Sequence, residues 1–361
     1  MNKSHNYFRK IGWILLGLLA VLLRITLSEA AIETWYSRGV FVALRWLIDY
    51  LLAWLPVPLM YLLLPALLFF GARNTRRWYR AQQSWRTKTW QALMATLSFA
   101  GATVCLFLFL WGFNYGRIPV ETHLGLEPKP LSFQQLQEEL TRETQVLLEL
   151  RPTIPGITDS AFTADLLPPH LESHMRYALT QRLQQYDFPT PGRVRGRLLY
   201  PKGIFLRFSS AGLYFPWTGE GHIDAGLHPL QIPYVMAHEM AHGYGFGDEG
   251  DCNFWAYLAC IGAEHPAIAY AGHLDYWRSL AADFARYDRE AFLALRQSLP
   301  PGIQADLQAI YDYLRRYPDI MPRLRYVAYD AYLRTQGIEE GMLNYDRVTM
   351  LVYAWRKTRA L

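Results

Sequence analysis

The stretch PYVMAHEMAHGYGFGDEGDCNFWAYLAC, residues 233–260, decides how the second half of the chain folds. Its first part predicts a helix, because Pro233 suits a first helical turn and apolar residues follow at helical spacing. Glycines beginning at Gly243 then end that helix. His238 and His242 are four residues apart, so both imidazoles are expected on one face of the helix.

Two imidazoles on one helical face can bind a single Zn²⁺. Glu239 follows the first histidine, so its carboxylate is placed to take a proton from a zinc-bound water, as the HExxH pattern requires. The other interpretation is that neighbouring residues satisfy both histidines and no metal binds. It is disfavoured because a chance HExxH is rare and this one has helical context. The sequence therefore predicts a Zn²⁺ site held by His238 and His242.

A third protein ligand is needed, and the acids Asp248, Glu249 and Asp251 compete for this role. If a new helix starts near Asp248, that residue is its N-cap and Glu249 lies in its first turn, with a side chain that can reach back. Asn253 then lies one turn below Glu249 and can orient an imidazole, while Asp251 points about 200° away. Glu249 is the predicted third ligand. The spacing HExxHxxGxxD, with Asp248 as the ligand, is the alternative.

His238, Glu239 and His242, followed by Glu249, resemble the gluzincin arrangement of thermolysin and the membrane CaaX-type proteases. In that arrangement a Glu on a second helix completes the zinc site. Those enzymes carry an Asp where this chain has Asn253, but an amide oxygen can still accept from an imidazole N–H.

Four runs of the sequence are also similar to a bacterial family of three-helix membrane proteins with a domain of unknown function. They are GLYFPWTGE (212–220), AHEMAHGYGF, DCNFWAYLAC and, near the C-terminus, YLRTQGIEEGMLNYDRV. This resemblance implies a mostly α fold. N-terminal transmembrane helices would be followed by an α+β zincin-like domain of gluzincin type with a small sheet.

Composition agrees with a membrane portion joined to a globular domain, since 52% of the 361 residues are hydrophobic. The net charge of +5 is concentrated in one loop, so it indicates membrane topology and not nucleic-acid binding. Three cysteines provide no disulfide framework. Cys252 and Cys260 are expected to be buried thiols. The oligomeric state is left open.

Hydrophobic segments at about 11–27, 54–71 and 92–113 predict three membrane spans, with an amphipathic surface helix at about 35–52. A cleaved signal peptide is the alternative for the first segment. The loop from Arg73 to Lys88 contains six basic residues and no acid, which predicts that it faces the cytoplasm. Residues 1–116 would then form the membrane domain. Residues 117–361 would lie on the periplasmic or extracellular side of a bacterial cytoplasmic membrane.

The outer domain is predicted to begin with a helix capped by Ser132 and Gln135 and to place a small sheet within residues 203–224. An exposed strand of that sheet could pair with an extended peptide substrate. A hydrogen-bond donor to the reaction's oxyanion is also expected. Tyr345 is the first candidate, with His273 and Tyr270 as alternatives.

These features predict a membrane-anchored zinc metallohydrolase that cleaves a peptide or protein substrate, with Glu239 as general base. The alternative is a non-catalytic, membrane-anchored binding protein with a structural or vestigial metal site. Glu239 favours the enzyme, because a structural zinc site has no need of that carboxylate.

Overall fold

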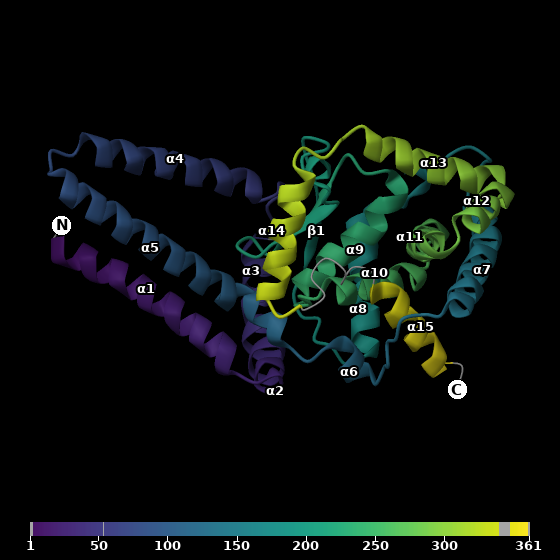
Figure 1. Cartoon of the computed structure of the whole chain (residues 1–361), viewed down its shortest axis with the longest axis horizontal. Coiled ribbons are helices and arrows are strands. Elements are labelled where there is room, and N and C mark those ends of the chain that lie inside the picture. The colour runs from purple at the N-terminus through teal and green to yellow at the C-terminus, as the bar shows by residue number, and fades with distance from the viewer. Residues whose placement is uncertain (1–2, 53, 339–346, 360–361) are drawn as a thin grey trace. The chain divides into compact units, whose positions relative to one another are not determined.

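Helices make up most of the chain in the computed structural model, which describes residues 3–52, 54–338 and 347–359 (Figure 1). The mostly helical fold with one small sheet agrees with the prediction. The chain divides into two units. Unit 1 comprises Met1–Arg117 with Pro216–Thr218, and unit 2 comprises Ile118–Phe215 with Gly219–Leu361.

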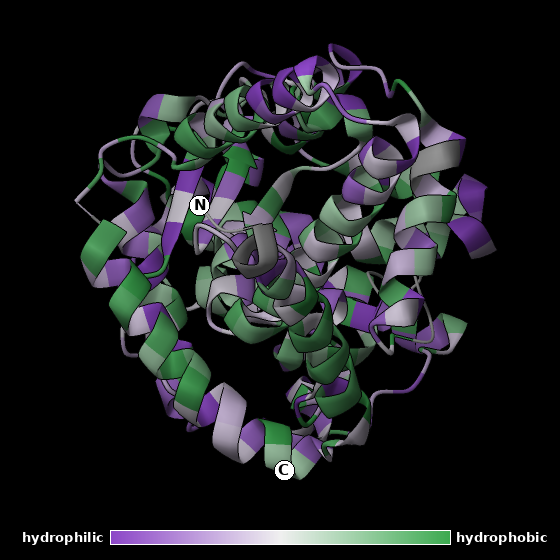
Figure 2. Ribbon diagram, turned by 90° about the vertical axis from the view of Figure 1, so that its left-hand side faces the viewer, coloured by the Kyte–Doolittle hydropathy of each residue, from purple (hydrophilic) through white to green (hydrophobic). Residues whose placement is uncertain are grey.

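Unit 1 is formed almost entirely by helices of the first 117 residues. In chain order they are α1 (Lys3–Thr26), α2 (Glu29–Ala31), the π-helix η1 (Ile32–Val40), α3 (Phe41–Leu52), α4 (Met60–Arg80), α5 (Trp85–Leu110) and the 3₁₀ helix η2 (Gly112–Gly116). Several helices of the molecule are hydrophobic over much of their length (green in Figure 2). Three spans were predicted from such segments, whereas the described helices provide one candidate span, or two if a bent helix pair is counted as one span.

Within the described residues, α5 is the one helix that is long and apolar enough to cross a bilayer. A second span results only if the bent pair Tyr7–Thr26 and Glu29–Leu52, with 113° between its parts, is one broken span. The predicted span 54–71 has different bounds: α4 starts at Met60, after two prolines, and continues to Arg80. The predicted loop from Arg73 to Lys88 is therefore helical at both ends.

Two glycines let α1 and α5 approach closely inside unit 1. A Cβ added at Gly17 would lie 2.7 Å from the Cα of Gly101, so neither position has room for a side chain. Small residues at such a contact are typical of helix pairs in membranes, where backbones pack directly against each other.

Unit 2 contains the sheet and the remaining helices. In chain order its elements are α6 (Val120–Leu124), α7 (Phe133–Leu150), η3 (Arg151–Thr153), η4 (Ala164–Leu166), α8 (Leu171–Gln185), β1 (Arg195–Leu199), η5 (Leu206–Phe208), β2 (Gly212–Phe215), β3 (Glu220–Asp224), η6 (Pro229–Gln231), α9 (Ile232–Gly243), α10 (Glu249–Ile261), α11 (Pro266–Tyr287), α12 (Arg289–Ser298), α13 (Pro301–Arg315), α14 (Pro322–Thr335) and α15 (Arg347–Arg359). The predicted capping box of Ser132 and Gln135 starts α7.

The sheet has the strand order β1-β3-β2, with β1 parallel and β2 antiparallel to β3. The small sheet predicted within residues 203–224 is present as β2 and β3, whereas β1 was not predicted. Its sequence, RGRLL, lacks the apolar alternation by which a strand is recognised. Arg195 and Arg197 instead form ion pairs of 3.1 and 2.9 Å with the buried Glu220. α9 packs against all three strands and also against α8, α10 and α11. The helix of the HExxH pattern is thus the centre of unit 2.

Buried histidines make the stability of unit 2 depend on pH. Burial, together with Arg197 and Arg195, lowers the pKa of His222 from 6.5 to about 4. In the unfolded chain this histidine takes up a proton near pH 6.5, so stability is present above that pH and is lost as pH falls toward 4. We expect His222 to reduce the free energy of unfolding by about 2 kcal/mol between pH 7 and pH 5.

Thermal unfolding of the wild type and of His222→Leu at both pH values measures this difference. The leucine variant should lose less stability on acidification than the wild type, and a variant of the exposed His174 should behave like the wild type. Equal acid sensitivity in all three proteins would show that His222 is not the source.

Candidate metal centre

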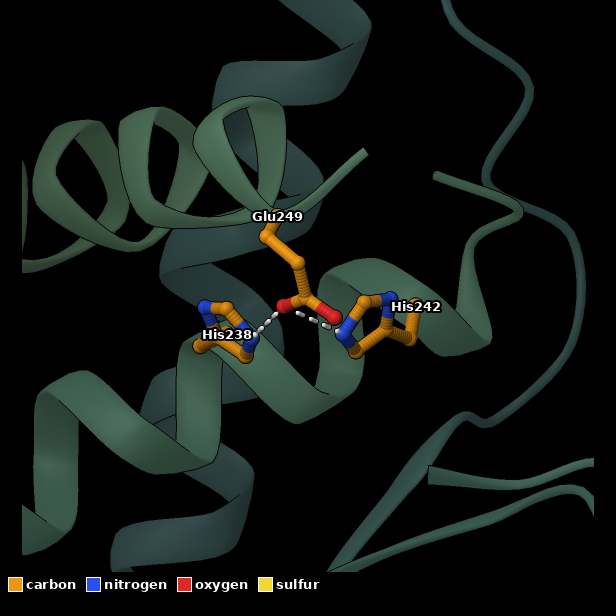
Figure 3. Close-up of side chains that lie close together, drawn as sticks. All are labelled: His238, His242 and Glu249. Carbon is orange, nitrogen blue, oxygen red and sulfur yellow. Dashed lines mark hydrogen bonds and ion pairs between the residues drawn. The ribbon is translucent and has the colours of Figure 1, made fainter. Parts of the chain in front are cut away.

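The two helices of the quoted stretch bring together three side chains of types that can ligate a metal. His238 and His242 project from α9, and Glu249 projects toward them from the first turn of α10 (Figure 3). Their nearest ligand atoms all lie within 4.8 Å of one another, and all three residues are buried. Glu249 Oε2 is 3.0 Å from His238 Nε2 and 3.4 Å from His242 Nε2.

The turn between the helices depends on glycine. α9 ends at Gly243, as predicted. Gly245 has a φ of +90°, a backbone conformation that residues other than glycine rarely adopt. This turn brings the carbonyl of Phe246 back to within 2.8 Å of His242 Nδ1. Asp248 then caps α10, and its side chain accepts a hydrogen bond from the Asp251 N–H, as predicted.

Both imidazoles are oriented by oxygen acceptors at Nδ1. His242 Nδ1 donates to the Phe246 carbonyl, and His238 Nδ1 donates to Asn253 Oδ1 at 2.8 Å. A carbonyl oxygen can only accept, so each Nδ1 carries a proton and each Nε2 is turned toward the carboxylate of Glu249. Such outer hydrogen bonds are typical of metal-ligating histidines.

Two Nε2 atoms that face one carboxylate form a set of ligand atoms that could hold a cation. Although burial opposes it, Cys252 and Glu249 raise the pKa of His242 well above its usual value, so without a cation a protonated imidazole can pair with this carboxylate. One proton can satisfy one contact, whereas a divalent cation satisfies all three. The set of two imidazoles and one carboxylate fits Zn²⁺ and leaves a coordination position open.

Glu239 lies beside this cluster in a tightly restricted space between α9 and the sheet. A Cβ added at Gly221 would lie 2.6 Å from the Glu239 Cβ, and one at Gly212 would lie 2.5 Å from its Oε1. Burial raises the pKa of Glu239 to about 7. Its Oε2 is buried and has no hydrogen-bond partner among the described residues. An unpartnered carboxylate oxygen with a near-neutral pKa is suited to accept and release a proton.

A cavity of about 700 Å³ opens onto His238 and Glu239. The edge strand β2 contributes Gly212 and Leu213 to its wall, and η5 contributes Phe208. Its lining also includes Asn253 and Tyr329. His238 and Glu239 therefore face a space large enough for several residues of an extended peptide.

Tyr329 is a site residue that the sequence did not indicate. Its hydroxyl, carried on α14, donates to Glu249 Oε1 at 2.8 Å, so the two carboxylate oxygens have different partners. Tyr329 and Glu249 are 80 residues apart, and no local sequence pattern links α14 to α10, so this contact could not be predicted from the sequence. Cys252 also adjoins the cluster, with Sγ 3.3 Å from His242 Nδ1. Burial raises the pKa of Cys252 to about 12, so it is a neutral thiol there.

The other acids of the stretch lie differently. Asp248 uses Oδ1 for the helix cap and Oδ2 for an ion pair with Arg347 at 2.9 Å. Asp251 is buried in α10 and does not belong to the group of three ligand atoms.

The candidate oxyanion donors are not brought to the cluster within the described chain. Tyr270 donates to Asp306 at 2.7 Å, and His273 bonds Glu143 at 2.8 Å, so each belongs to a separate buried network. Tyr345 lies outside the described residues.

We expect Tyr329→Phe to lower zinc affinity about 10- to 100-fold, because the hydroxyl that orients the Glu249 carboxylate is removed and the ring is kept. Competition with a chromogenic chelator measures this affinity in the purified protein. Tyr326→Phe, an exposed position on the same helix, is the control and should bind zinc like the wild type. Unchanged affinity in Tyr329→Phe would mean that its hydrogen bond does not support the ligand.

Comparison with known proteins identifies the family. A family model described as a protein of unknown function, DUF3810, matches residues 36–353, and the chain belongs to this family. No curated protein and no solved structure shows a significant match. Function is therefore argued from the chemistry of the cluster.

Proposed function

We propose that the protein is a membrane-anchored, zinc-dependent peptidase. The observation that carries this proposal is the convergence of His238 Nε2, His242 Nε2 and Glu249 Oε2 on one point, with the unpartnered carboxylate oxygen of Glu239 beside them. A structural zinc site is usually closed by four protein ligands, whereas this group supplies three and has no need of Glu239 as a base. The fourth group, placed at a cavity, supports hydrolysis.

Each residue has a distinct role in this proposal. His238, His242 and Glu249 hold Zn²⁺, and Asn253 and the Phe246 carbonyl fix the two imidazoles. When bound, Zn²⁺ lowers the pKa of water and polarises a carbonyl group. Glu239 accepts the proton of the attacking water and delivers it to the leaving amine.

The edge of the sheet supports a peptide as the substrate. β2 pairs with β3 on one side only, and the same strand lines the cavity next to His238 and Glu239. An extended peptide can add to an edge strand of this kind as a further strand of the sheet. Such binding depends mainly on the backbone of the substrate, so it can hold a peptide bond at the cluster for substrates with different side chains.

Zinc analysis of the purified full-length protein tests the proposal. We expect one Zn²⁺ per chain, chelator-sensitive cleavage of an unstructured protein substrate, and loss of both in His238→Ala. His174→Ala removes an exposed histidine of the same unit and should retain both. A wild-type protein that binds no zinc after loading would contradict the proposal.

We also propose that unit 1 is a multi-pass anchor in a bacterial cytoplasmic membrane, with unit 2 on the outer side. The span candidate α5 supports the anchor, and the basic residues around residues 73–88 support a cytoplasmic position for that segment. Reporter fusions after residue 80 and at the C-terminus should report opposite sides. Equal signals would overturn this topology.

A further inference from the structure

We propose that the mouth of the cavity carries a surface that docks on an anionic lipid bilayer. The surface, named the rim, consists of six exposed apolar residues: Phe208, Leu213, Ile320, Met321, Tyr326 and Val327. Each is between 42% and 66% exposed, and Val327 is the most exposed of them. Large apolar side chains gathered in this way mark an interaction site on a soluble unit.

Two segments that are distant in sequence meet to form the rim. The Ile320 N–H donates to the Arg207 carbonyl at 2.9 Å, and Ser209 Oγ donates to Asp319 at 2.5 Å. Phe208 and Leu213 line the cavity from one segment, and Tyr329 of α14 lines it from the other. Tyr326 lies about one helical turn before Tyr329, and Val327 follows it on the exposed side of α14. The rim therefore borders the mouth of the cavity.

Charge decides the kind of partner. Exposed basic residues, among them Lys202, Arg207 and Arg323, lie in the same two segments. Residues 200–215 contain no acid, and Asp319 is the single acid of residues 316–329. Its carboxylate already accepts from Ser209 and from the Met321 N–H. Apolar and aromatic side chains among uncompensated cations fit an anionic membrane interface.

The covalent connection favours the same partner. The span candidate α5 ends at Leu110, and unit 2 begins at Ile118, so seven residues, 111–117, join them. Seven residues extend over at most about 25 Å. A bilayer crossed by α5 is thus always within reach of unit 2, at a high effective concentration. Docking brings the cavity mouth to the bilayer surface, where peptide segments next to membrane anchors are accessible. That last consequence rests on the proposed function.

Lipid-quenching fluorescence on the full-length protein in vesicles tests the docking. An environment-sensitive dye is attached to Val327→Cys or to the control Tyr287→Cys, whose parent residue is also 66% exposed, in a Cys105→Ser background. Cys252 and Cys260 are buried. Vesicles of phosphatidylcholine, with or without phosphatidylglycerol, carry a spin-labelled lipid as quencher. We expect quenching at position 327 in the phosphatidylglycerol vesicles, and none at position 287.

Charge reversal sharpens the test. Arg207→Glu with Arg323→Glu should shift the ratio of docked to undocked unit at least about thirtyfold toward undocked. Lys129→Glu with Arg289→Glu, an equal change on exposed residues outside the rim, should leave the ratio as it is. Equal quenching at both dye positions, or quenching unaffected by the rim reversal, overturns the proposal. A shift in the dye's emission that occurs without quenching by the spin-labelled lipid and grows with protein concentration also overturns the proposal, because it indicates self-association.

The readout is lipid contact and requires neither zinc nor turnover. In the Glu239→Gln background the dye should be quenched to the same extent. Failure of docking therefore leaves the peptidase proposal in place, and failure of the zinc test leaves docking in place.

Discussion

Glu239→Gln should abolish peptide hydrolysis while the protein keeps its zinc. The side chain is not one of the three ligands, so the metal stays, but an amide cannot accept the proton of the attacking water. General-base catalysis contributes about 10²- to 10⁴-fold, so a loss of about a thousandfold in kcat is expected. Glu264→Gln, at an exposed position of the same unit, is the matched control and should retain full activity.

Glu239→Gln should also change the thermal stability of the protein. Glu239 Oε2 is buried without a partner in the described part of the chain, so folding has to desolvate this carboxyl group. The neutral amide of Gln reduces that cost, and Tm should stay equal or rise. Zinc content, turnover and Tm are measured on one preparation. Unchanged turnover excludes Glu239 as the base, and loss of zinc would make it a ligand.

Removal of the third ligand should have the largest effect on metal binding. Glu249→Ala is expected to lower zinc affinity roughly 100- to 1,000-fold, because one of about four ligands supplies near a quarter of the 10–16 kcal/mol found for protein zinc sites. The substitution also leaves two imidazoles without the carboxylate that they face at 3.0 and 3.4 Å. Asn253→Ala should be intermediate, about 10- to 100-fold, since it only releases the ring of His238.

Asp248→Ala and Asp251→Ala serve as controls on neighbouring acids. Asp248→Ala removes the cap of α10, so it should lower stability by about 1 kcal/mol and leave zinc affinity nearly unchanged. Competitive chelation at one pH compares all four variants. If Asp248→Ala releases the metal while Glu249→Ala retains it, the HExxHxxGxxD spacing describes the site instead.

The sequence predicted those parts of the fold that depend on local rules. Helical spacing and glycine signals located α9, and the preference of Asp for a cap located the start of α10. The geometry between Glu249 and Asn253 followed from one helical turn. Each of these features is settled within a few residues of the chain.

Contacts between distant segments could not be predicted in this way. Tyr329 reaches Glu249 through the packing of α14, and β1 joins the sheet through ion pairs where the sequence has no apolar alternation. In unit 1, the π-helix η1 and the late start of α4 at Met60 depend on local backbone geometry that a hydrophobic run does not specify.

The hydrogen bonds at the two Nδ1 atoms also determine how the metal is exchanged. Asn253 and the Phe246 carbonyl hold the imidazoles from behind, so both Nε2 atoms stay aimed at the same point whether or not an ion is there. If Zn²⁺ binds as proposed, we expect it to enter and leave without ring rotation or helix opening, so that its exchange is uncoupled from unfolding. A chelator should strip the protein without loss of its helical circular dichroism, and added zinc should restore activity within the time of mixing. Metal supply alone would then switch the proposed activity on and off, without a cycle of unfolding and refolding.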